Sequence, residues 1–276
     1  MLLSEIYEIA DSIAPKALSD EMCAKFGFYD NSGVLVDAGE GITSILFSLD
    51  FSDGAVEKAI KLKANLIITH HPAIYGKISD VCIDDPLGKK LVRCLRNGIS
   101  VMSMHLNLDT AAGGLDESLK EGILLSAGQT TGAGMRLNDN FAFEPYLHPL
   151  TQGAYGRVYN VPNVTLGNLA EGIKKEFTTD KVLVYGALDT PINKAASFCG
   201  AGADESAVAF AISEGADVII SADFKHHIIT MAQEAGISLI ILTHYASENY
   251  GFKKYYEKIR AQVGVPCVYH TDENLL

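Results

Sequence analysis

The side chains best suited to chemistry in this sequence are histidines and carboxylates that follow apolar runs. His244 and Glu248 come directly after the run that ends at Thr243, and they stand four positions apart. If the chain turns from strand into helix there, this spacing places both side chains on one helical face. Because open α/β sheets bind ligands at the carboxyl ends of their strands, the pair indicates a site at that edge.

Two further apolar runs deliver metal-binding residue types where they stop. His70 and His71 follow one run, and His105 follows the other, with Asp109 four positions later. Neighbouring residues of a strand point to opposite faces. We therefore expect His70 and His71 to diverge, which would allow them to serve two different metal ions in one pocket.

The mixture of imidazole and carboxylate groups predicts a pair of divalent cations. A bridging carboxylate with imidazoles on either side is what two cations about 3.5 to 4 Å apart require. These ligands suit zinc, manganese, iron, cobalt or nickel, and the sequence leaves that choice open. Spacing also does not settle which of His105, His226 and His227 bind metal and which act as acid/base or supporting groups.

Other polar motifs have plainer interpretations. Gly200-Ala-Gly202 resembles a phosphate-binding turn, but acidic residues at the start of the following helix would repel phosphate. Asp223 either orients a histidine or caps the next helix, and both interpretations stay open. We interpret residues 30–33 as a turn that leads into a strand, and His148 and His270 as surface or core residues.

Strands and helices alternate along most of the chain. The pattern predicts strands at 42–49, 66–69, 99–104, 217–221 and 237–242. It predicts helices from the N-terminus to about Pro15 and at 53–63, 87–97, 115–125, 228–235 and 250–262. A strand, helix, strand order implies parallel neighbouring strands, so the fold class is α/β.

The sequence also resembles itself. Residues 64–71 are similar to residues 216–221, which are followed by a second His-His pair, and residues 98–105 are similar to 236–244. This order favours a degenerate duplication, in which two related α/β domains face a central cleft with a dinuclear metal site. We expect residues 1–126 plus about 195–276 to form the metal-binding core. Between about 127 and 194 the pattern loosens, which indicates a smaller inserted or second domain.

Charge and composition restrict the partners. The net charge of −12 makes a nucleic-acid partner unlikely, because such a surface repels phosphates. The five cysteines are scattered with no C-x-x-C pair, as is typical of reduced thiols in a cytosolic protein. The N-terminus lacks a signal-peptide pattern, and no apolar run approaches the roughly 20 residues that span a membrane. We expect a soluble, cytoplasmic protein with a small-molecule substrate.

Several motifs in one order resemble the Nif-three-like family, whose members are also labelled GTP cyclohydrolase I type 2 homologues. The resemblance covers most of the chain and fades between 126 and 194. It rests on Asp30-Asn-Ser-Gly33, Ile68-Thr-His-His-Pro72, His105-Leu-Asn-Leu-Asp109, Gly113-Gly-Leu-Asp116, Gly200-Ala-Gly202, Ala222-Asp-Phe-Lys-His-His227 and Thr243-His-Tyr-Ala-Ser-Glu248.

This resemblance implies two α/β domains around two divalent metal ions per subunit, and a ring-shaped homohexamer built as a trimer of dimers. The implied metal ligands are His70, His71, Asp109, His244 and Glu248, with Glu248 as the bridge. His105, His226 and His227 would line the same cavity and supply the acid/base group.

The sequence therefore predicts a dinuclear metal-dependent hydrolase, cyclohydrolase-like, that acts on a nucleotide-like or other small substrate. The alternative is a non-catalytic metal-binding scaffold or regulatory adaptor. An NAD-dependent oxidoreductase would need a complete glycine fingerprint after an early strand, and the sequence contains none.

Overall fold

The computed structural model describes residues 1–39, 41–131 and 145–276. The chain divides into two compact units. Unit 1 comprises Met1–Ala111, Leu150–Gln152 and Phe252–Asp272, and unit 2 comprises Ala112–Pro149, Gly153–Gly251 and Glu273–Leu276. Residues 132–144, part of the segment expected to form the smaller domain, lie outside the described residues.

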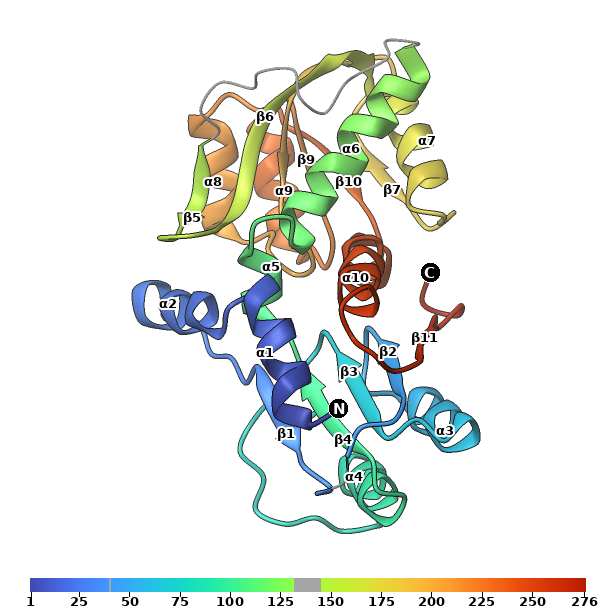
Figure 1. Ribbon diagram of the computed structural model, residues 1–276. Coiled ribbons are helices and arrows are strands. Elements are labelled where there is room, and N and C mark those ends of the chain that lie inside the picture. The colour runs from blue at the N-terminus through green and yellow to red at the C-terminus, as the bar shows by residue number, and fades with distance from the viewer. Residues whose placement is uncertain (40, 132–144) are drawn as a thin grey trace. The chain divides into compact units, whose positions relative to one another are not determined.

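Unit 1 contains a mostly parallel sheet with the strand order β1-β4-β3-β2-β11 (Figure 1). Its strands are β1 (Gly33–Val36), β2 (Ile45–Ser48), β3 (Leu66–Thr69), β4 (Ser100–Ser103) and β11 (Cys267–His270). Its helices are α1 (Leu3–Ile13), α2 (Lys16–Phe26), α3 (Asp53–Leu62), α4 (Pro86–Arg96) and α5 (Leu106–Thr110). Helix α10 (His244–Arg260) begins in unit 2 and ends in unit 1. The strand β1 is antiparallel to β4, and β2, β3, β4 and β11 run parallel.

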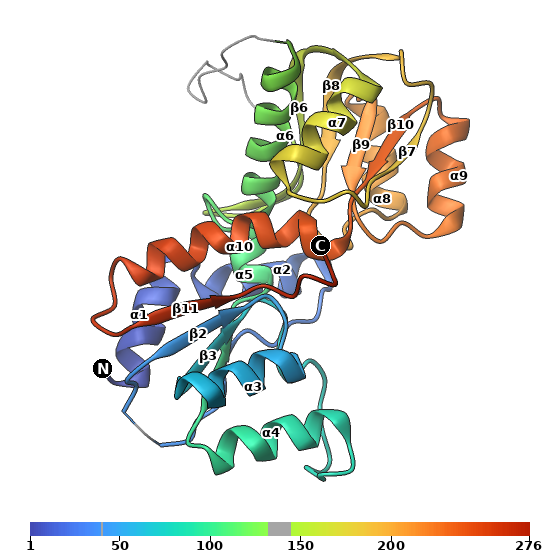
Figure 2. The ribbon, with the colours of Figure 1, turned by 90° about the vertical axis from the view of Figure 1, so that its right-hand side faces the viewer.

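Helices cover both faces of the unit 1 sheet, which explains why its strands are apolar throughout. On one face, Leu46 and Ile67 pack in a buried cluster with Val56 of α3 and Leu91 of α4. On the other face, the ring of Phe47 lies 6.3 Å from Phe252, in the part of α10 that belongs to unit 1. Figure 2 shows this end of α10 on the side of the sheet opposite α3 and α4.

Unit 2 contains a second sheet with the strand order β5-β6-β8-β9-β10-β7. Its strands are β5 (Tyr146–Pro149), β6 (Ala154–Thr165), β7 (Leu183–Tyr185), β8 (Pro191–Ser197), β9 (Val218–Ser221) and β10 (Ser238–Ile241). Its helices are α6 (Leu115–Thr131), α7 (Leu166–Glu176), α8 (Glu205–Ser213) and α9 (His226–Glu234). The helices α6 and α7 lie on one face of this sheet, and α8 and α9 lie on the other (Figure 2).

The division into units differs from the boundaries expected from the sequence. Residues 195–251, which we placed with the N-terminal core, belong to unit 2. The reason is strand pairing: β8 is hydrogen-bonded to β6 on one side and to β9 on the other, so all three share one sheet. The segment 145–194 is therefore half of a sheet rather than a separate inserted body.

Both sheets contain the same arrangement of four strands. In unit 1 the neighbours are β1-β4-β3-β2, and in unit 2 they are β7-β10-β9-β8. In each case the first strand of the set is antiparallel to its neighbour and the other three are parallel. The internal similarity seen in the sequence, between 64–71 and 216–221 and between 98–105 and 236–244, falls on β3 and β9 and on β4 and β10. Shared topology supports the predicted duplication.

Among the described residues, no helix combines the length and the apolar character needed to cross a membrane. The helix expected at 250–262 begins earlier, at His244. His244 and Glu248 therefore both lie on α10, as the four-residue spacing required.

Candidate metal centre

Three histidines of unit 1 gather at the carboxyl edge of its sheet. His70 and His71 follow β3, and His105 follows the neighbouring strand β4. The ring centroid of His70 lies 4.8 Å from that of His71 and 5.1 Å from that of His105. Each of the three offers one ring nitrogen, and these nitrogens all lie within 4.8 Å of one another. We call these residues the histidine cluster.

The rings of His70 and His71 lie side by side, with centroids 4.8 Å apart, and their binding of two different metal ions stays a prediction. Strand β3 ends at Thr69, so the alternation of side chains does not extend to the two histidines. The backbone N–H groups of both residues donate to the carbonyl of Leu49, at 3.1 and 3.0 Å. This shared acceptor turns the chain at the strand end and brings both rings into one cluster.

One ring nitrogen of each clustered histidine is held by a hydrogen-bond acceptor. The Nδ1 atom of His70 lies 2.8 Å from the Met104 carbonyl, and Nδ1 of His71 lies 2.7 Å from Oδ1 of Asp50. A carbonyl can only accept, and so can an ionised carboxylate, so Nδ1 carries the proton in each ring. In the neutral imidazole the lone pair is then on Nε2, which is the form that binds a metal.

Asp30 holds the third histidine in the same way. Its Oδ1 lies 2.7 Å from Nδ1 of His105, and its Oδ2 accepts hydrogen bonds from Ser19 and Ser32 at 2.5 Å each. Burial raises the pKa of Asp30, but the hydrogen bonds from His105 and the two serines lower it more, so the pKa lies below its ordinary value. Asp30 is therefore a fixed anion, and residues 30–33 form more than the turn that we expected.

Asp109 lies close to the histidine cluster on the short helix α5. This helix starts directly after His105, so the four-residue spacing brings Asp109 back towards the strand end. Oδ1 of Asp109 is 3.5 Å from Nε2 of His70, which is long for a hydrogen bond. Two ligands that are each about 2.1 Å from one cation lie about 3 to 3.5 Å apart, so this separation fits joint coordination.

In unit 2, the first turns of α10 carry the second pair of ligand-type side chains. Nε2 of His244 lies 3.0 Å from Oε2 of Glu248. Nδ1 of His244 lies 2.5 Å from Oδ2 of Asp223 and is thereby protonated. Nε2 of His244 and Oε2 of Glu248 would then face each other with lone pairs. Two such atoms repel each other, and a cation bound to both removes the repulsion.

Asp223 orients a histidine rather than capping a helix. It has a left-handed backbone with φ 51°, and the N-cap of α9 is Lys225. A non-glycine residue in this conformation is strained, and such residues gather at functional sites. Of the two interpretations that the sequence left open, the structure supports the first.

The glycine turn after β8 supports Glu248 directly. Gly200 has φ +58°, and a Cβ atom there would lie 2.1 Å from Oε1 of Glu248 and 3.2 Å from Nε2 of His244. Gly202 is equally constrained, since its Cβ would lie 1.9 Å from the hydroxyl of Tyr155. Packing against side chains accounts for both glycines without a phosphate ligand.

A buried ion pair anchors the same turn. Asp116, in the Gly-Gly-Leu-Asp motif, accepts hydrogen bonds from Nε of Arg157 at 2.7 Å and from the backbone N–H of Gly156 at 3.1 Å. It also accepts from the backbone of Cys199, the residue before Gly200. Both side chains of the pair are buried, and the turn is thereby fixed to the start of α6.

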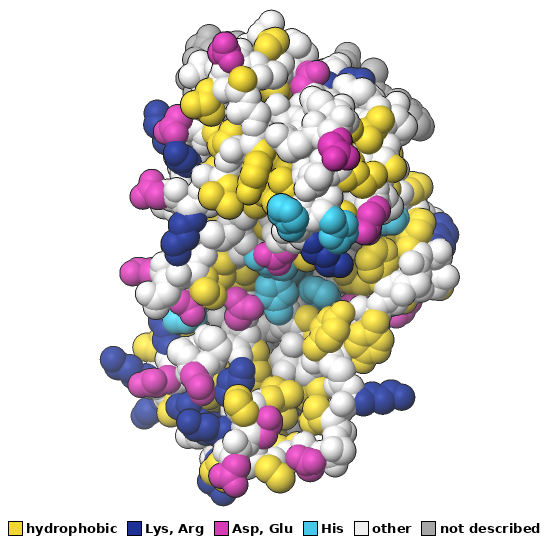
Figure 3. Space-filling view, turned by 180° about the vertical axis from the view of Figure 1, so that it is seen from behind, with side chains coloured by type: hydrophobic (Ala, Val, Ile, Leu, Met, Phe, Trp, Pro, Cys, Tyr) yellow, Lys and Arg dark blue, Asp and Glu magenta, His cyan; other side chains and the backbone are white. Residues whose placement is uncertain are grey.

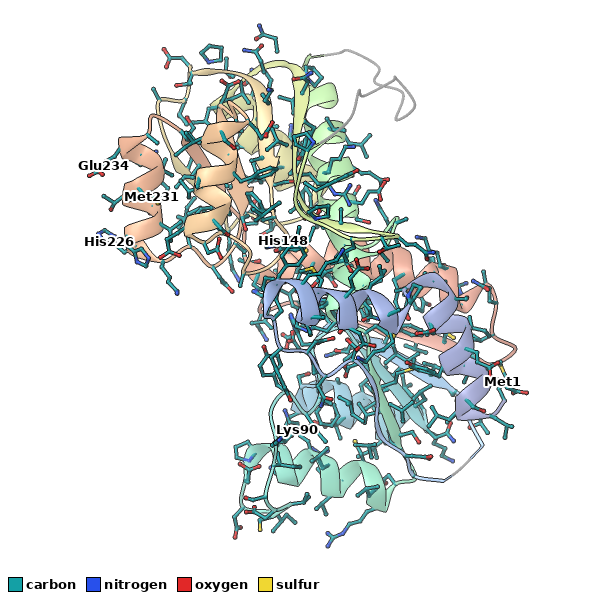
Figure 4. The ribbon with its side chains drawn as sticks, turned by 90° about the vertical axis from the view of Figure 1, so that its left-hand side faces the viewer. Met1, Lys90, His148, His226, Met231 and Glu234 are labelled. Carbon is teal, nitrogen blue, oxygen red and sulfur yellow. The ribbon has the colours of Figure 1, made fainter. Side chains whose placement is uncertain are left out.

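His226 and His227, the other two acid/base candidates, lie exposed at the start of α9. Nε2 of His227 forms a surface pair with Oε1 of Glu205 at 2.8 Å. Figure 4 shows His226 projecting from α9 on the same helix as Met231 and Glu234. The space-filling view shows histidine side chains open to solvent beside acidic ones (Figure 3). Among the described residues, neither His226 nor His227 joins a group that could hold a metal ion.

Two functional carboxylates were missed by sequence reasoning. Asp50 stands two residues beyond β2, and Asp30 stands three residues before β1, each beside a strand that carries a histidine. The sequence shows only that an acidic residue lies close to a strand end. It does not show which histidine that residue contacts, because this depends on the order of the strands in the sheet.

The chain matches the Duf34/NIF3 (NGG1p interacting factor 3) family over residues 1–274. It belongs to this family. The NIF3-family chain is 29% identical over 265 residues to a GTP cyclohydrolase 1 type 2 homolog of Clostridium perfringens, which covers 95% of this chain and 93% of that protein. It is 26% identical over 255 residues to the protein NIF3 homolog of Schizosaccharomyces pombe, and the match covers 89% of this chain and 84% of that protein.

Solved structures show the same fold. Reduced HcgD from Methanocaldococcus jannaschii has a TM-score of 0.75 and 28% identity, with 98% of this chain and 97% of that chain covered. A Bacillus cereus protein related to NIF3 has a TM-score of 0.76 and 23% identity, with 98% and 97% covered. The family resemblance predicted from the sequence is therefore confirmed.

Proposed function

We propose that this NIF3-family protein is a divalent-metal-dependent hydrolase with a dinuclear metal centre. The ligands are His70, His71 and Asp109 of unit 1 and His244 and Glu248 of unit 2, with Glu248 as the bridge. The observation that carries the proposal is the hydrogen-bond pattern: each of the ligand histidines has its Nδ1 atom on an acceptor, so the lone pair of each ring is on Nε2, the form that binds a metal.

Ligand-type side chains follow strand ends in both units. The carboxyl ends of strands are where open α/β sheets bind ligands, which supports a metal-binding role for these residues.

Bound divalent cations would lower the pKa of a coordinated water towards neutrality and polarise the substrate. The protein's own residues supply the proton transfer. Nε2 of His105 can accept a proton, because Nδ1 of the same ring is held by Asp30. The buried Asp30 carboxylate stabilises the imidazolium that results and keeps the ring in place. We assign the acid/base role to His105 in preference to the exposed His226 and His227.

The proposed substrate is a nucleotide-like or other small electrophilic molecule. The protein has a net charge of −12, so bound cations would supply the positive potential that an anionic substrate needs. The curated relatives named GTP cyclohydrolase 1 type 2 homologs agree with a heterocyclic or phosphate-bearing substrate. Hydrolysis adds water to an electrophilic carbon or phosphorus atom, and the proton leaves with the displaced group.

Replacement of Glu248 tests the proposal. Glu248→Gln should lose at least one metal ion per chain and all turnover in a metabolite screen of the Zn²⁺- or Mn²⁺-loaded protein. Glu257→Gln is a matched control on the same helix, because the Glu257 carboxylate lies in an exposed pair with Arg260 at 3.2 Å. Full turnover by Glu248→Gln with its metal removed would refute the hydrolase.

The family description, an interacting factor, favours a second candidate, which is a metal-binding scaffold or regulatory adaptor. The same metabolite screen separates the two functions. Saturable binding of a protein partner, without turnover of any metabolite by the metal-loaded chain, would support the scaffold. Turnover of any nucleotide would support the hydrolase.

A further inference from the structure

Three histidines at the candidate centre are each paired with an aspartate through Nδ1. The distances are 2.7 Å for His71 and Asp50, 2.7 Å for His105 and Asp30, and 2.5 Å for His244 and Asp223. The aspartate and the histidine of each pair flank neighbouring strands. These strands are β2 and β3 for Asp50, β1 and β4 for Asp30, and β9 and β10 for Asp223.

We propose that Asp30, Asp50 and Asp223 are positioning residues that fix the tautomer and the ring orientation of the three histidines. A neutral imidazole has a single N–H group, and a carboxylate accepts it at Nδ1. The lone pair is therefore confined to Nε2, on the side of the ring away from the aspartate. This inference rests on the proposed metal centre, for which His71 and His244 are ligands and His105 is the acid/base group.

Burial of Asp30 supports a role beyond stability. Its side chain is 0% exposed, and its second oxygen is occupied by the hydroxyl groups of Ser19 and Ser32. A buried carboxylate contributes little net stability even when it is hydrogen-bonded, because its desolvation offsets the attraction. The backbone N–H of His105 also donates to Ser32, at 3.0 Å. Both the ring and the backbone of His105 are thus held by one small network.

The backbone of Asp223 gives an independent argument. A left-handed backbone is unfavourable for a non-glycine residue, although aspartate tolerates it better than most residues. The Asp223 side chain does not cap α9, so its hydrogen bond to His244 is the contact that this conformation serves. His70 reaches the same tautomer through the backbone carbonyl of Met104, which no side-chain replacement can remove.

The test combines a tautomer measurement with a metal titration on the full chain. Asp50→Asn and Asp223→Asn are preferred because both aspartates are partly exposed, and asparagine also tolerates the left-handed backbone. Nitrogen NMR of ¹⁵N-histidine-labelled, metal-free protein reports the tautomer of each ring. We expect the partner histidine to gain an Nε2–H form, and the Zn²⁺ affinity measured by calorimetry to fall about 10- to 100-fold.

Glu205→Gln is the matched control, since Glu205 holds His227 through Nε2 in an exposed pair on α8 and α9. That variant should keep the Zn²⁺ affinity of the wild type. If the wild type binds Zn²⁺ and both aspartate variants bind it equally well with unchanged tautomers, the positioning role is refuted. If the wild-type His71 and His244 resonances do not respond to Zn²⁺, the proposed function fails instead, and the tautomers of the metal-free variants still test the positioning.

Discussion

Gly200 leaves the space in which the Glu248 carboxylate lies. It combines φ +58° with a Cβ position only 2.1 Å from Oε1 of Glu248. Any side chain there must either move the carboxylate or distort the turn. Gly215 has a similar φ of +69°, yet a Cβ atom on it would meet nothing within 4 Å. Replacement of either glycine by alanine strains the backbone, but only replacement of Gly200 also introduces a contact with Glu248. Comparing the two variants therefore separates the effect of the contact from the effect of the backbone.

We predict that Gly200→Ala and Gly215→Ala both lose roughly 1–2 kcal/mol of unfolding free energy for the left-handed backbone. Only Gly200→Ala should also weaken Zn²⁺ binding, because it displaces Glu248. Chemical denaturation and Zn²⁺ titration of both variants measure the two effects. Equal Zn²⁺ affinities in the two variants would show that Gly200 does not position the carboxylate.

His148 makes the stability of unit 2 depend on pH. Burial lowers the pKa of its imidazole, and Asp204 only partly opposes this shift. The unfolded chain therefore binds a proton more readily, so the contribution of neutral His148 is present above its ordinary pKa of about 6.5 and is lost as the pH falls through that value. Its ring is stacked on Tyr155, with ring centroids 6.2 Å apart.

We predict that His148→Phe, which keeps a ring beside Tyr155, loses less unfolding free energy than the wild type when the pH is lowered from about 7.5 to about 5.5. Urea denaturation at the two pH values measures this difference. An identical loss in both proteins would assign the pH dependence to other groups.

The candidate ligand residues carry a signal that is visible in the sequence, whereas the aspartates hydrogen-bonded to the histidines do not. Three candidate ligands are histidines that directly follow an apolar run. The other two are carboxylates that stand four residues after a histidine of this kind, so neighbouring residues in the sequence are enough to find them. Asp30 and His105 are 75 residues apart, and Asp50 and His71 are 21 residues apart. Only the strand order, with β1 beside β4 and β2 beside β3, brings these pairs together.

At the level of elements, the two four-stranded sets show how one arrangement can present different ligands. After β3 the chain places His70 and His71, whereas after the equivalent strand β9 it places Ala222 and Asp223. The end of β3 therefore presents two imidazoles, and the end of β9 presents a carboxylate at the position equivalent to His71. A duplication followed by divergence explains this division of roles.

Strands were predicted more accurately than short or polar helices. The strand β3 coincides with its predicted range, because four buried apolar or β-branched residues leave little ambiguity. Helix α2 was not predicted, since only Leu18, Ser19 and Met22 of its residues are buried and the apolar pattern is weak. Helix α5 has five residues, too few for a periodic signal.

The packing of α7 on α6 depends on a glycine inside a helix. A Cβ atom on Gly172 would lie 2.5 Å from the backbone carbonyl of Ser126, which cannot rotate away. In α3, by contrast, a Cβ atom on Gly54 would come no closer than 3.4 Å to His270, an ordinary contact. Gly172 is thus required for close approach, and Gly54 is not.

We predict that Gly172→Ala lowers the free energy of unfolding by about 1–3 kcal/mol through overpacking. Gly54→Ala should leave it unchanged or raise it by up to about 1 kcal/mol, the usual gain in helix propensity. Chemical denaturation of both variants provides the comparison. A stabilised Gly172→Ala variant would contradict the close packing of these helices.

At the scale of the whole molecule, the acidic composition gives the proposed cations a second effect. Each chain has a net charge of −12, and two divalent ions per chain would partly neutralise it. Reduced repulsion between chains favours association. Metal binding and assembly are therefore expected to be linked.

The homohexamer expected from the family resemblance stays a prediction. Light scattering coupled to size exclusion should give six times the chain mass of 29.7 kDa for the metal-loaded protein. Treatment with a chelator should reduce the hexamer fraction if the two events are linked. A mass of one chain under metal-loaded conditions would contradict the ring.

The most direct test of the proposed dinuclear centre is anomalous diffraction from crystals of the Zn²⁺-loaded protein, measured at the zinc absorption edge. We predict two anomalous peaks per chain, with His71 of unit 1 and Glu248 of unit 2 bound to a common ion. Peaks that contact the residues of only one unit, with His71 and Glu248 bound to separate, distant ions, would contradict the account.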